Sequence, residues 1–355
     1  MSVAVMKAQV HKVGRSRLAD VGRAGSGFPA IVSDHMLTAE YRDGAWQAPV
    51  IAAYAPLPLV PNISALQYGV SVFEGLKAQR APDGSILLFR PWDNARRLNR
   101  SAARLAMPEV PEAMFLEGLR ELVRLDRDWV PANGAGALYI RPCLFSIDES
   151  VRVKPADRFL FVVFTFPFAA YFAAPLDVLV TENYVRAFPG GTGDIKPGGN
   201  YAAGMLAEQL ARDAGFHTVM WLDGVEHRYV EECGVTNVFF VLGDEVVTPA
   251  LSGTILAGIT RDSVLTLLRE AGHTVRERRV SIDEIVAAHE RGDLRECFGV
   301  GTAATLTPVR RIRYRERDLV LPAVEEQKVG AATRTRLVAI ASGLETDSHG
   351  WIERL

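Results

Sequence analysis

Hydrophobic and polar positions in the first half of the chain predict alternating strands and helices. Leu98, Ala102 and Leu105 recur at helical spacing after Asp93, which predicts an amphipathic helix capped by that aspartate. The run Arg158–Phe166 is almost entirely apolar, which is typical of a strand buried on both faces. The pattern as a whole predicts strands at 31–41, from 45 onward, 85–89, 138–142 and 158–166, and helices at 93–105 and 112–125.

The pattern breaks near the middle of the chain, where residues 169–175 mix small and aromatic side chains and end in proline. We therefore expect a small N-terminal α/β domain at 1–168, a linker at 169–176 and a larger C-terminal domain at 177–355. Beyond the linker, apolar runs predict strands at 218–222, 230–242 and 245–248, and helices at 201–214 and after residue 263. The expected class is α/β, with helices and strands mixed in both domains (α+β).

Composition is that of an ordinary globular protein and excludes several functions. The net charge is only −2 and no block rich in lysine and arginine occurs, so neither nucleic acid nor a membrane surface is an expected partner. The three cysteines lie far apart without a CxxC motif, which argues against a disulfide framework and against a metal site. No signal-peptide pattern and no apolar run of the ~20 residues needed to span a membrane is present, so we expect a cytoplasmic protein.

A glycine-rich loop with a single lysine precedes the helix predicted at 201–214. Residues 190–201 hold Lys196 among five glycines, and glycine lets a backbone turn sharply and approach a ligand closely. Such a lysine can clasp a phosphate or form an imine with a carbonyl compound; a solvated surface lysine is the simple alternative. The phosphate-loop motif fails, because Ile195 precedes the lysine and Pro197 follows it.

Two further turns of small residues could present backbone amides to a ligand. Gly258 and Thr260 lie where a helix is predicted to begin, and the free N–H groups and dipole of a helix N-terminus attract anions. A plain N-cap explains the same residues. Residues 298–304 form the second such turn.

Together these features suit pyridoxal phosphate. Its aldehyde can react with Lys196, its phosphate suits Arg97 and the amides that follow Gly258, and a carboxylate such as Glu232 can keep its ring nitrogen protonated. The alternative is a non-catalytic module that binds a phosphorylated ligand through the same arginine and turn. Such a module has no need of Lys196, Tyr201 and Glu232 together.

Ordered sequence blocks between Phe28 and Ile312 make the hypothesis sharper. These blocks are 33–37, 68, 73–78, 88–94, 97, 101–102, 138–142, 190–193, 196, 199–201, 232–239, 253–261 and 301–303. They resemble the class IV pyridoxal-phosphate aminotransferases, and within them the branched-chain amino acid aminotransferases. The resemblance implies a two-domain fold-type-IV enzyme, similar to D-amino acid aminotransferase, with the cofactor between the domains. It also implies ping-pong transfer of the amino group between L-leucine, L-isoleucine or L-valine and 2-oxoglutarate.

The resemblance implies a role for each cofactor-binding residue. Lys196 is the catalytic residue, joined covalently to the cofactor and later moving a proton between the substrate α-carbon and the cofactor C4′ carbon, and Tyr201 donates to the cofactor phenolate oxygen. Glu232 pairs with the pyridine nitrogen. Glu231 is the alternative candidate for this role, and because side chains alternate along a strand, the two glutamates should point to opposite faces of the sheet. The implied cofactor-binding set is Arg97, Lys196, Tyr201, Glu232, Ile259, Thr260 and Thr302, with Arg97 and the amides of residues 259 and 260 on the phosphate.

The resemblance likewise implies an apolar substrate cavity with carboxylate donors. The implied substrate-binding set is an apolar wall of Phe28, Tyr68, Phe73 and Tyr139, carboxylate-binding amides at Thr302 and Ala303, Arg141 for the glutamate side chain, and Val151 and Val153 on a loop that reaches into a neighbouring subunit. That loop implies a homodimer or a higher homo-oligomer. For each aromatic residue, ordinary core packing is the alternative.

Two alternatives lie within the same class, a D-amino acid aminotransferase and an aminodeoxychorismate lyase. The arm that carries Phe28 and the block 139–142 argue against both. The chain departs from the family pattern at Val300, where relatives often have a serine or threonine beside the phosphate. No cysteine pair follows Ala303, so a thiol switch is not expected there.

Overall fold

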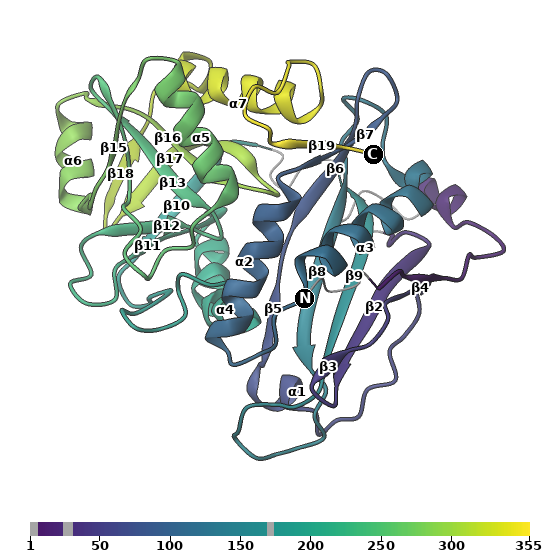
Figure 1. Cartoon of the computed structure of the whole chain (residues 1–355). Coiled ribbons are helices and arrows are strands. Elements are labelled where there is room, and N and C mark those ends of the chain that lie inside the picture. The colour runs from purple at the N-terminus through teal and green to yellow at the C-terminus, as the bar shows by residue number, and fades with distance from the viewer. Residues whose placement is uncertain (1–5, 24–30, 169–173) are drawn as a thin grey trace. The chain divides into compact units, whose positions relative to one another are not determined.

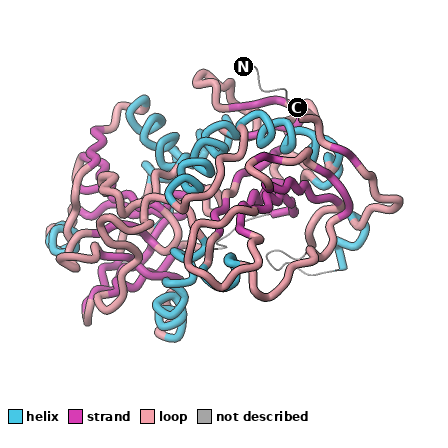
Figure 2. The backbone as a smooth tube through the Cα atoms, turned by 60° about the horizontal axis from the view of Figure 1, so that its bottom comes forward, coloured by secondary structure: helices cyan, strands magenta, loops and turns pink. Residues whose placement is uncertain are grey.

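The computed structural model describes residues 6–23, 31–168 and 174–355. They form two compact units, each of which combines helices with strands. Figure 2 colours the helices and strands along the chain. Unit 1 contains the described part of Met1–Ala169 together with Lys196–Gly198 and Ala339–Leu355. Unit 2 contains the described part of Ala170–Ile195 together with Gly199–Val338. The expected mixture of helices and strands is confirmed.

A ten-stranded sheet forms the framework of unit 1, in the order β1-β4-β2-β9-β8-β6-β7-β19, with β3 beside β2 and β5 beside β8. The runs predicted at 138–142 and 158–166 are the antiparallel neighbours β8 and β9 at its centre. The bounds are β1 (Gln9–Val10), β2 (His35–Arg42), β3 (Ala45–Trp46), β4 (Val50–Ala53), β5 (Ser71–Phe73), β6 (Leu76–Arg80), β7 (Ile86–Phe89), β8 (Ala137–Ser146), β9 (Phe159–Phe168) and β19 (Ile352–Arg354).

Helices α2 (Pro91–Arg104) and α3 (Glu112–Leu125) lie along one face of this sheet (Figure 1). Their apolar sides, including Leu98 and Leu119, are fully buried in the core of unit 1, where each such side chain contributes roughly 1.5–3 kcal/mol. The expectation that Asp93 caps α2 is wrong. The helix begins two residues earlier at Pro91, whose fixed φ suits the first turn, and Asp93 accepts a hydrogen bond from Arg90 Nε at 2.7 Å. The remaining helices of unit 1 are η1 (Leu18–Arg23), α1 (Ser64–Tyr68) and η2 (Arg127–Trp129).

The C-terminal end of the chain belongs to unit 1, which differs from the expected C-terminal domain at 177–355. Strand β19 pairs antiparallel with β7, and the N–H of Leu355 donates to Ile86 O at 2.8 Å. Trp351 packs edge-on against Phe89 with ring centroids 5.7 Å apart. Backbone pairing between segments so far apart leaves no local hydrophobic pattern, so the sequence does not reveal it. Residues 169–173 of the expected linker lie outside the described part of the chain.

Unit 2 is built on a nine-stranded sheet in the order β12-β11-β10-β17-β16-β13-β14-β15, with β18 beside β17. Strand β10 runs parallel to both of its neighbours, and most other pairs are antiparallel. Helices α5 and α6 lie beside this sheet (Figure 1). The strand bounds are β10 (Leu176–Thr181), β11 (Thr218–Leu222), β12 (Val230–Cys233), β13 (Asn237–Leu242), β14 (Glu245–Thr248), β15 (Thr274–Glu277), β16 (Leu294–Gly301), β17 (Thr305–Tyr314) and β18 (Arg317–Val320). The helices are α4 (Gly198–Asp213), α5 (Ile259–Glu270), α6 (Ile282–Glu290), η3 (Val324–Glu326) and α7 (Lys328–Ala341), of which α4 begins and α7 ends in unit 1.

The segment 230–242, expected as one strand, is two strands separated by a tight turn. Gly234 adopts φ 56° there, a left-handed conformation that favours glycine, and the Thr236 hydroxyl donates to Cys233 O at 2.7 Å. The turn ends β12 just after Glu231 and Glu232 and lets β13 begin at Asn237. Across the described ranges, none of the helices is long and apolar enough to cross a membrane.

Candidate active site

Lys196 is held against an aromatic ring in unit 1. Its Nζ lies 4.7 Å from the centroid of the Phe73 ring. The Lys196 N–H donates to Ser101 Oγ at 3.1 Å, and the Phe73 N–H donates to Lys196 O at 3.1 Å. An isolated β-bridge joins Pro197 to Val72. The backbone of the lysine is therefore fixed by β5 and α2, which is not the environment of a solvated surface lysine in a loose turn.

Glu74 and Arg97 form a buried, two-pronged ion pair in unit 1. Arg97 Nε lies 2.7 Å from Glu74 Oε1, and Arg97 Nη2 lies 2.9 Å from Oε2. Asn94 Nδ2 donates to the same Oε2 at 2.8 Å. Burial raises the pKa of Glu74, but the positive charges of Arg97 and Lys196 and these hydrogen bonds outweigh burial and hold it below its ordinary value. A permanent carboxylate thus orients the guanidinium of Arg97, the predicted phosphate ligand.

The predicted substrate residues Phe73, Tyr139 and Arg141 gather in the same unit. The guanidinium carbon of Arg141 lies 5.0 Å from the Phe73 ring centroid and 5.4 Å from that of Tyr139. Tyr139 also stacks on Phe166 with centroids 5.2 Å apart. Gly75 makes room for this arrangement, because a Cβ there would overlap the Tyr139 hydroxyl. Arg141 Nε is buried and has no hydrogen-bond partner among the described residues, which suits a site that receives an anion.

Other predicted substrate residues lie at the surface of unit 1. Tyr68, at the end of α1, is 43% exposed, and its hydroxyl donates to Val151 O. The side chains of Val151 and Val153 are 66% and 86% exposed. Apolar side chains this exposed would be covered by a partner if the predicted subunit contact forms. Phe28 lies outside the described residues.

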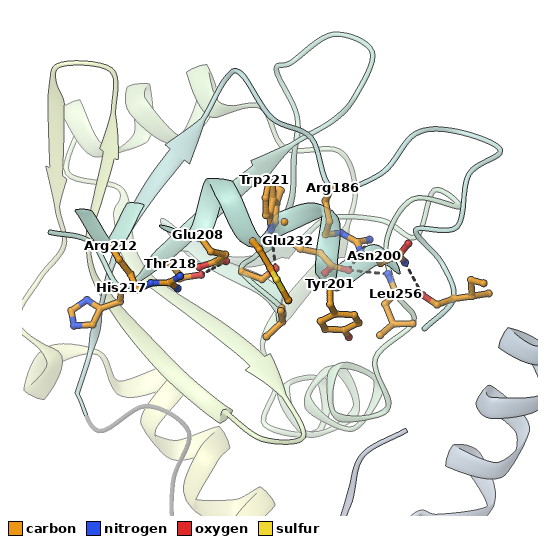
Figure 3. Close-up of a pocket in the computed structure, with 15 residues that line it drawn as sticks. Arg186, Asn200, Tyr201, Glu208, Arg212, His217, Thr218, Trp221, Glu232 and Leu256 are labelled. Carbon is orange, nitrogen blue, oxygen red and sulfur yellow. Dashed lines mark hydrogen bonds and ion pairs between the residues drawn. The ribbon is translucent and has the colours of Figure 1, made fainter. Parts of the chain in front are cut away.

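Unit 2 contains a pocket of about 310 Å³ lined by Tyr201 and Glu232 (Figure 3). Figure 3 shows Arg186 and Glu232 side by side there; Arg186 Nη2 lies 3.3 Å from Glu232 Oε1, and their side chains are only 10% and 5% exposed. The N–H of Leu256 donates to the same carboxylate oxygen at 2.9 Å. Farther along the pocket, the Thr218 hydroxyl donates to Glu208 Oε1 at 2.8 Å, and burial raises the pKa of Glu208.

Glu231 and Glu232 point to opposite faces of β12, as strand alternation predicts. Glu232 lines the pocket that contains Tyr201 and Arg186. Glu231 instead lines a second pocket of about 370 Å³, which we call the Glu231 pocket and which contains neither of them. This arrangement favours Glu232 over Glu231 as the partner of a cofactor ring nitrogen.

Arg186 is a site residue that the sequence analysis missed. Besides Glu232, its Nη2 donates to Gly193 O at 2.9 Å and to Thr254 O. One guanidinium therefore joins the glycine-rich loop before Lys196, strand β12 and the segment that leads to α5. Arg186 lies in an irregular loop after β10, where no hydrophobic period marks it. The available signal was chemical, because a buried Glu232 needs a positive partner and Arg186 is the arginine next to the glycine-rich loop.

The N-terminus of α5 has the features of an anion site. No side chain caps the helix within the described residues, and Gly258 occupies the N-cap position with φ −70° and ψ 130°. A Cβ at Gly258 would overlap Asn237 Oδ1, so only glycine fits beside that amide. Asn237 Nδ2 in turn donates to Leu256 O at 2.9 Å. The predicted phosphate-binding residues Ile259 and Thr260 form the first turn of this helix.

Thr302 and Ala303 form the tight turn between β16 and β17. Near the end of β16, Gly299 packs against Thr236; a Cβ at this glycine would lie only 2.6 Å from the Thr236 hydroxyl. The next residue, Val300, is fully buried and pairs in register with Asn237. Its apolar side chain is part of the packing of unit 2 and supplies no hydroxyl to a ligand.

The chemistry of these residues fits pyridoxal phosphate. Unit 1 contains a lysine whose backbone is fixed and a guanidinium that a carboxylate orients. Unit 2 contains a pocket with a buried carboxylate and a tyrosine, and a helix N-terminus without a side-chain cap beside an obligatory glycine. Within the described ranges, no three histidine, cysteine, aspartate or glutamate side chains cluster so that they could hold a metal ion.

The sequence profile of the family Amino-transferase class IV matches residues 71–312. The chain is 46% identical over 338 residues to the branched-chain-amino-acid aminotransferase of Mycobacterium tuberculosis (strain ATCC 25618 / H37Rv), covering 93% of this chain and 92% of the relative. It is 46% identical over 300 residues to branched-chain-amino-acid transaminase 1 of Bacillus subtilis (strain 168), covering 83% and 84%. The chain belongs to the branched-chain amino acid aminotransferase family of the class IV aminotransferases.

Solved structures agree with this family. The branched-chain amino acid aminotransferase of Escherichia coli has a TM-score of 0.73 to this chain at 26% identity, covering 90% of this chain and 98% of the other. A second branched-chain amino acid aminotransferase, from T.th. and solved with pyridoxamine 5′-phosphate, has a TM-score of 0.71 at 28% identity, covering 89% and 97%. Class IV aminotransferases depend on pyridoxal 5′-phosphate, so the sequence-based expectation of this cofactor is confirmed.

Proposed function

We propose that the protein transfers the amino group between L-leucine, L-isoleucine or L-valine and 2-oxoglutarate, in two half-reactions of a ping-pong cycle. The observation that carries this proposal is the identity, over nearly the whole chain, with relatives that bear the name of branched-chain-amino-acid aminotransferases. In one half-reaction the amino acid becomes its 2-oxo acid and leaves its amino group on the enzyme. In the other, 2-oxoglutarate takes up that amino group and leaves as glutamate.

Lys196 is the residue that we propose to carry the proton. Pyridoxal phosphate supplies an aldehyde that joins amines covalently and a ring that draws electrons from the substrate α-carbon. Once substrate has displaced it, the Lys196 amine must be neutral to take the α-proton and return it to the cofactor C4′ carbon. The contact of Nζ with the Phe73 ring and the fixed backbone support this role, because both limit where the amine can move.

Glu232 and Tyr201 are proposed to act on the cofactor ring. A carboxylate beside the pyridine nitrogen holds a proton there and strengthens the ring as an electron acceptor. Arg186 supports this role by fixing the Glu232 side chain and by compensating its buried charge. Tyr201 donates to the phenolate oxygen, while Arg97, Ile259, Thr260 and Thr302 bind the phosphate.

The substrate residues are proposed to follow the family pattern. Phe28, Tyr68, Phe73 and Tyr139 surround the branched side chain, and the amides of Thr302 and Ala303 bind the α-carboxylate. Arg141, with its buried Nε, accommodates the side-chain carboxylate of glutamate. The exposed Val151 and Val153 complete the pocket of a neighbouring copy, so the active form is a homodimer or a higher homo-oligomer. We also propose that the enzyme works in the cytoplasm.

Comparing amino donors tests the proposal. The purified protein, loaded with pyridoxal phosphate, is given 2-oxoglutarate with L-leucine, L-isoleucine, L-valine or D-alanine, and glutamate is measured. We expect glutamate from the three branched L-amino acids and none from D-alanine. A protein that binds the cofactor but uses only D-alanine would be a D-amino acid aminotransferase, and one that uses none of these donors would contradict the substrate assignment.

A further inference from the structure

The Glu231 pocket lies on the face of β12 opposite to Glu232, and the proposed function makes no use of it. All of its lining residues belong to unit 2, and its volume of about 370 Å³ lies at the lower end of small-molecule sites. The lining residues are Pro189, Asp223, Gly224, Val225, Glu226, Tyr229, Val230, Glu231, Pro249, Ala250, Ser252, Thr254, Ile255 and Arg279.

The Glu231 carboxyl is only half satisfied. Its Oε1 accepts a hydrogen bond from the Thr254 hydroxyl, and Thr254 is itself bonded to Ser252. Its Oε2 is buried and has no hydrogen-bond partner among the described residues, although the side chain is 5% exposed and lines a pocket. A buried carboxylate oxygen without a donor is costly in a folded protein, so this atom points to a missing partner.

The charges around the pocket favour a cationic partner. Three carboxylates, those of Asp223, Glu226 and Glu231, line it together with one guanidinium, that of Arg279. Arg279 donates to Glu226 at 2.7 Å and stacks on the Tyr229 ring, so its charge is already matched. Burial raises the pKa of Asp223, but its carboxylate accepts hydrogen bonds from four backbone N–H groups, and these outweigh burial. The pKa of Asp223 is thereby lowered to about 2, so this group stays ionised.

Burial and, to a smaller extent, the charges of Glu232 and Asp223 raise the pKa of Glu231, although the Thr254 hydroxyl and the charge of Arg186 partly offset this. A cation next to Oε2 would favour the ionised form of this carboxyl, so the pocket is suited to a positively charged partner.

The rest of the lining is suited to an organic body and not to a bare ion. Pro189, Val225, Pro249 and Ile255 supply apolar surface next to the carboxyl. A metal ion would need several oxygen ligands around it, whereas the described residues contain no cluster of three carboxylate or imidazole side chains that could hold one.

We propose that the Glu231 pocket binds a small organic ammonium ion, whose N–H groups donate to Glu231 Oε2 while its short apolar body packs against Val225, Pro249 and Ile255. The ligand is thus of the alkylamine class. The ligand would be linked to Thr254 through Glu231, because the Thr254 hydroxyl donates to the other oxygen of that carboxyl. The carbonyl oxygen of Thr254 in turn accepts a hydrogen bond from Arg186. The proposal concerns binding alone and does not depend on the proposed aminotransferase substrates.

Piperidine tests the proposal by calorimetric titration of the holoenzyme. As a cyclic secondary amine it carries two N–H donors on an apolar ring, and tetrahydropyran is the matched neutral ring with oxygen in place of the charged nitrogen. We expect piperidine to bind at least tenfold more tightly than tetrahydropyran, because a hydrogen bond to a buried charge is worth about this factor or more. The absorbance band of the bound cofactor should stay unchanged during the titration.

Two variants locate the binding. Glu231→Gln keeps the shape of the side chain but removes its charge, and we expect it to weaken piperidine binding about tenfold or more. Glu208→Gln is the matched control, since Glu208 is also a partly buried carboxyl that accepts from a threonine hydroxyl, but it lines the pocket that contains Glu232. The Glu208→Gln variant should bind piperidine as tightly as the unmodified protein. Equal affinity for the two rings, undiminished affinity in Glu231→Gln, no binding at all, or a shift of the cofactor band would each overturn the proposal.

Discussion

Arg186 and Glu232 form an ion pair inside unit 2, with 3.3 Å between Nη2 and Oε1 and both side chains at most 10% exposed. The same guanidinium also binds the carbonyl oxygens of Gly193 and Thr254. Arg186 is therefore the common neighbour of the carboxylate that we assign to the cofactor ring, the loop before Lys196 and the approach to α5. Substitution of Arg186 should therefore disturb the structure at all three places.

Replacing Arg186 with glutamine should destabilise the apoprotein by about 3–5 kcal/mol, because it leaves the buried charge of Glu232 without a partner. It should also weaken cofactor binding, since Glu232 and the 254–256 segment lose their common support. Urea unfolding of the apoprotein and titration with pyridoxal phosphate measure the two effects. Arg315→Gln, which removes an exposed pair with Glu182, is the control and should change neither. Unchanged unfolding of Arg186→Gln would show that the pair does not hold Glu232.

Replacing Lys196 with alanine should abolish transamination and remove the absorbance band that depends on the covalent link to this lysine. The variant should still fold and still bind the cofactor without covalent attachment, because Arg97, Tyr201 and the α5 amides remain. Spectra and activity assays check this, with Lys328→Ala, an exposed lysine of α7, as the control. Borohydride reduction of the holoenzyme followed by peptide mapping offers an independent measurement. If the reduced cofactor is found elsewhere than on Lys196, the assignment of the catalytic lysine is wrong.

Local patterns in the sequence predicted much of this fold and part of the site. The period of α3 and the alternation that separates Glu231 from Glu232 are properties of neighbouring residues, and both agree with the structure. Pairing between distant segments could not be predicted in this way, as with β19 on β7. Arg186 was missed for a related reason, because its partners lie on three separate segments and its loop has no regular spacing.

Glu74→Gln should destabilise unit 1 by about 3–5 kcal/mol at neutral pH, since it leaves the buried Arg97 facing a neutral side chain. The folded-state pKa of Glu74 is lowered, so its stabilising contribution is present above its unfolded value near 4.5 and is lost as the pH falls below it. The difference between the native protein and the variant should therefore shrink below that pH. Urea unfolding over a pH series measures it, with Glu117→Gln, a half-exposed partner of Arg120, as control. A difference that is the same at every pH would contradict this account.

Gly75→Ala should impair the use of L-leucine, because the added Cβ overlaps the Tyr139 hydroxyl and displaces the ring that Phe166 and Arg141 contact. We expect the KM for leucine to rise roughly tenfold, the effect of losing one apolar contact worth ~1–3 kcal/mol. Gly14→Ala is the matched control, since nothing lies within 4 Å of a Cβ at that position. An unchanged KM in a folded Gly75→Ala variant would remove Tyr139 from the substrate wall.

The thiols of the native protein should be nearly inert toward maleimides at pH 8. Burial raises the pKa of Cys143 to about 11 and raises those of Cys233 and Cys297 still further, so very little thiolate is present. Against an ordinary thiol of pKa ~8.5, the reactive fraction of Cys143 at pH 8 is lower by about two orders of magnitude.

Mass spectrometry after timed labelling measures this protection, and the same protein unfolded in guanidinium is the control, in which all three cysteines should react rapidly. Cys233 and Cys297 lie within the apolar core of unit 2, so their labelling requires that unit to open. Their protection should therefore fall in parallel with stability in Arg186→Gln, the variant that weakens unit 2, and not in Glu74→Gln. If native Cys233 or Cys297 reacts as fast as free cysteine, the core packing described for unit 2 is contradicted. If Cys143 does so, its raised pKa is contradicted.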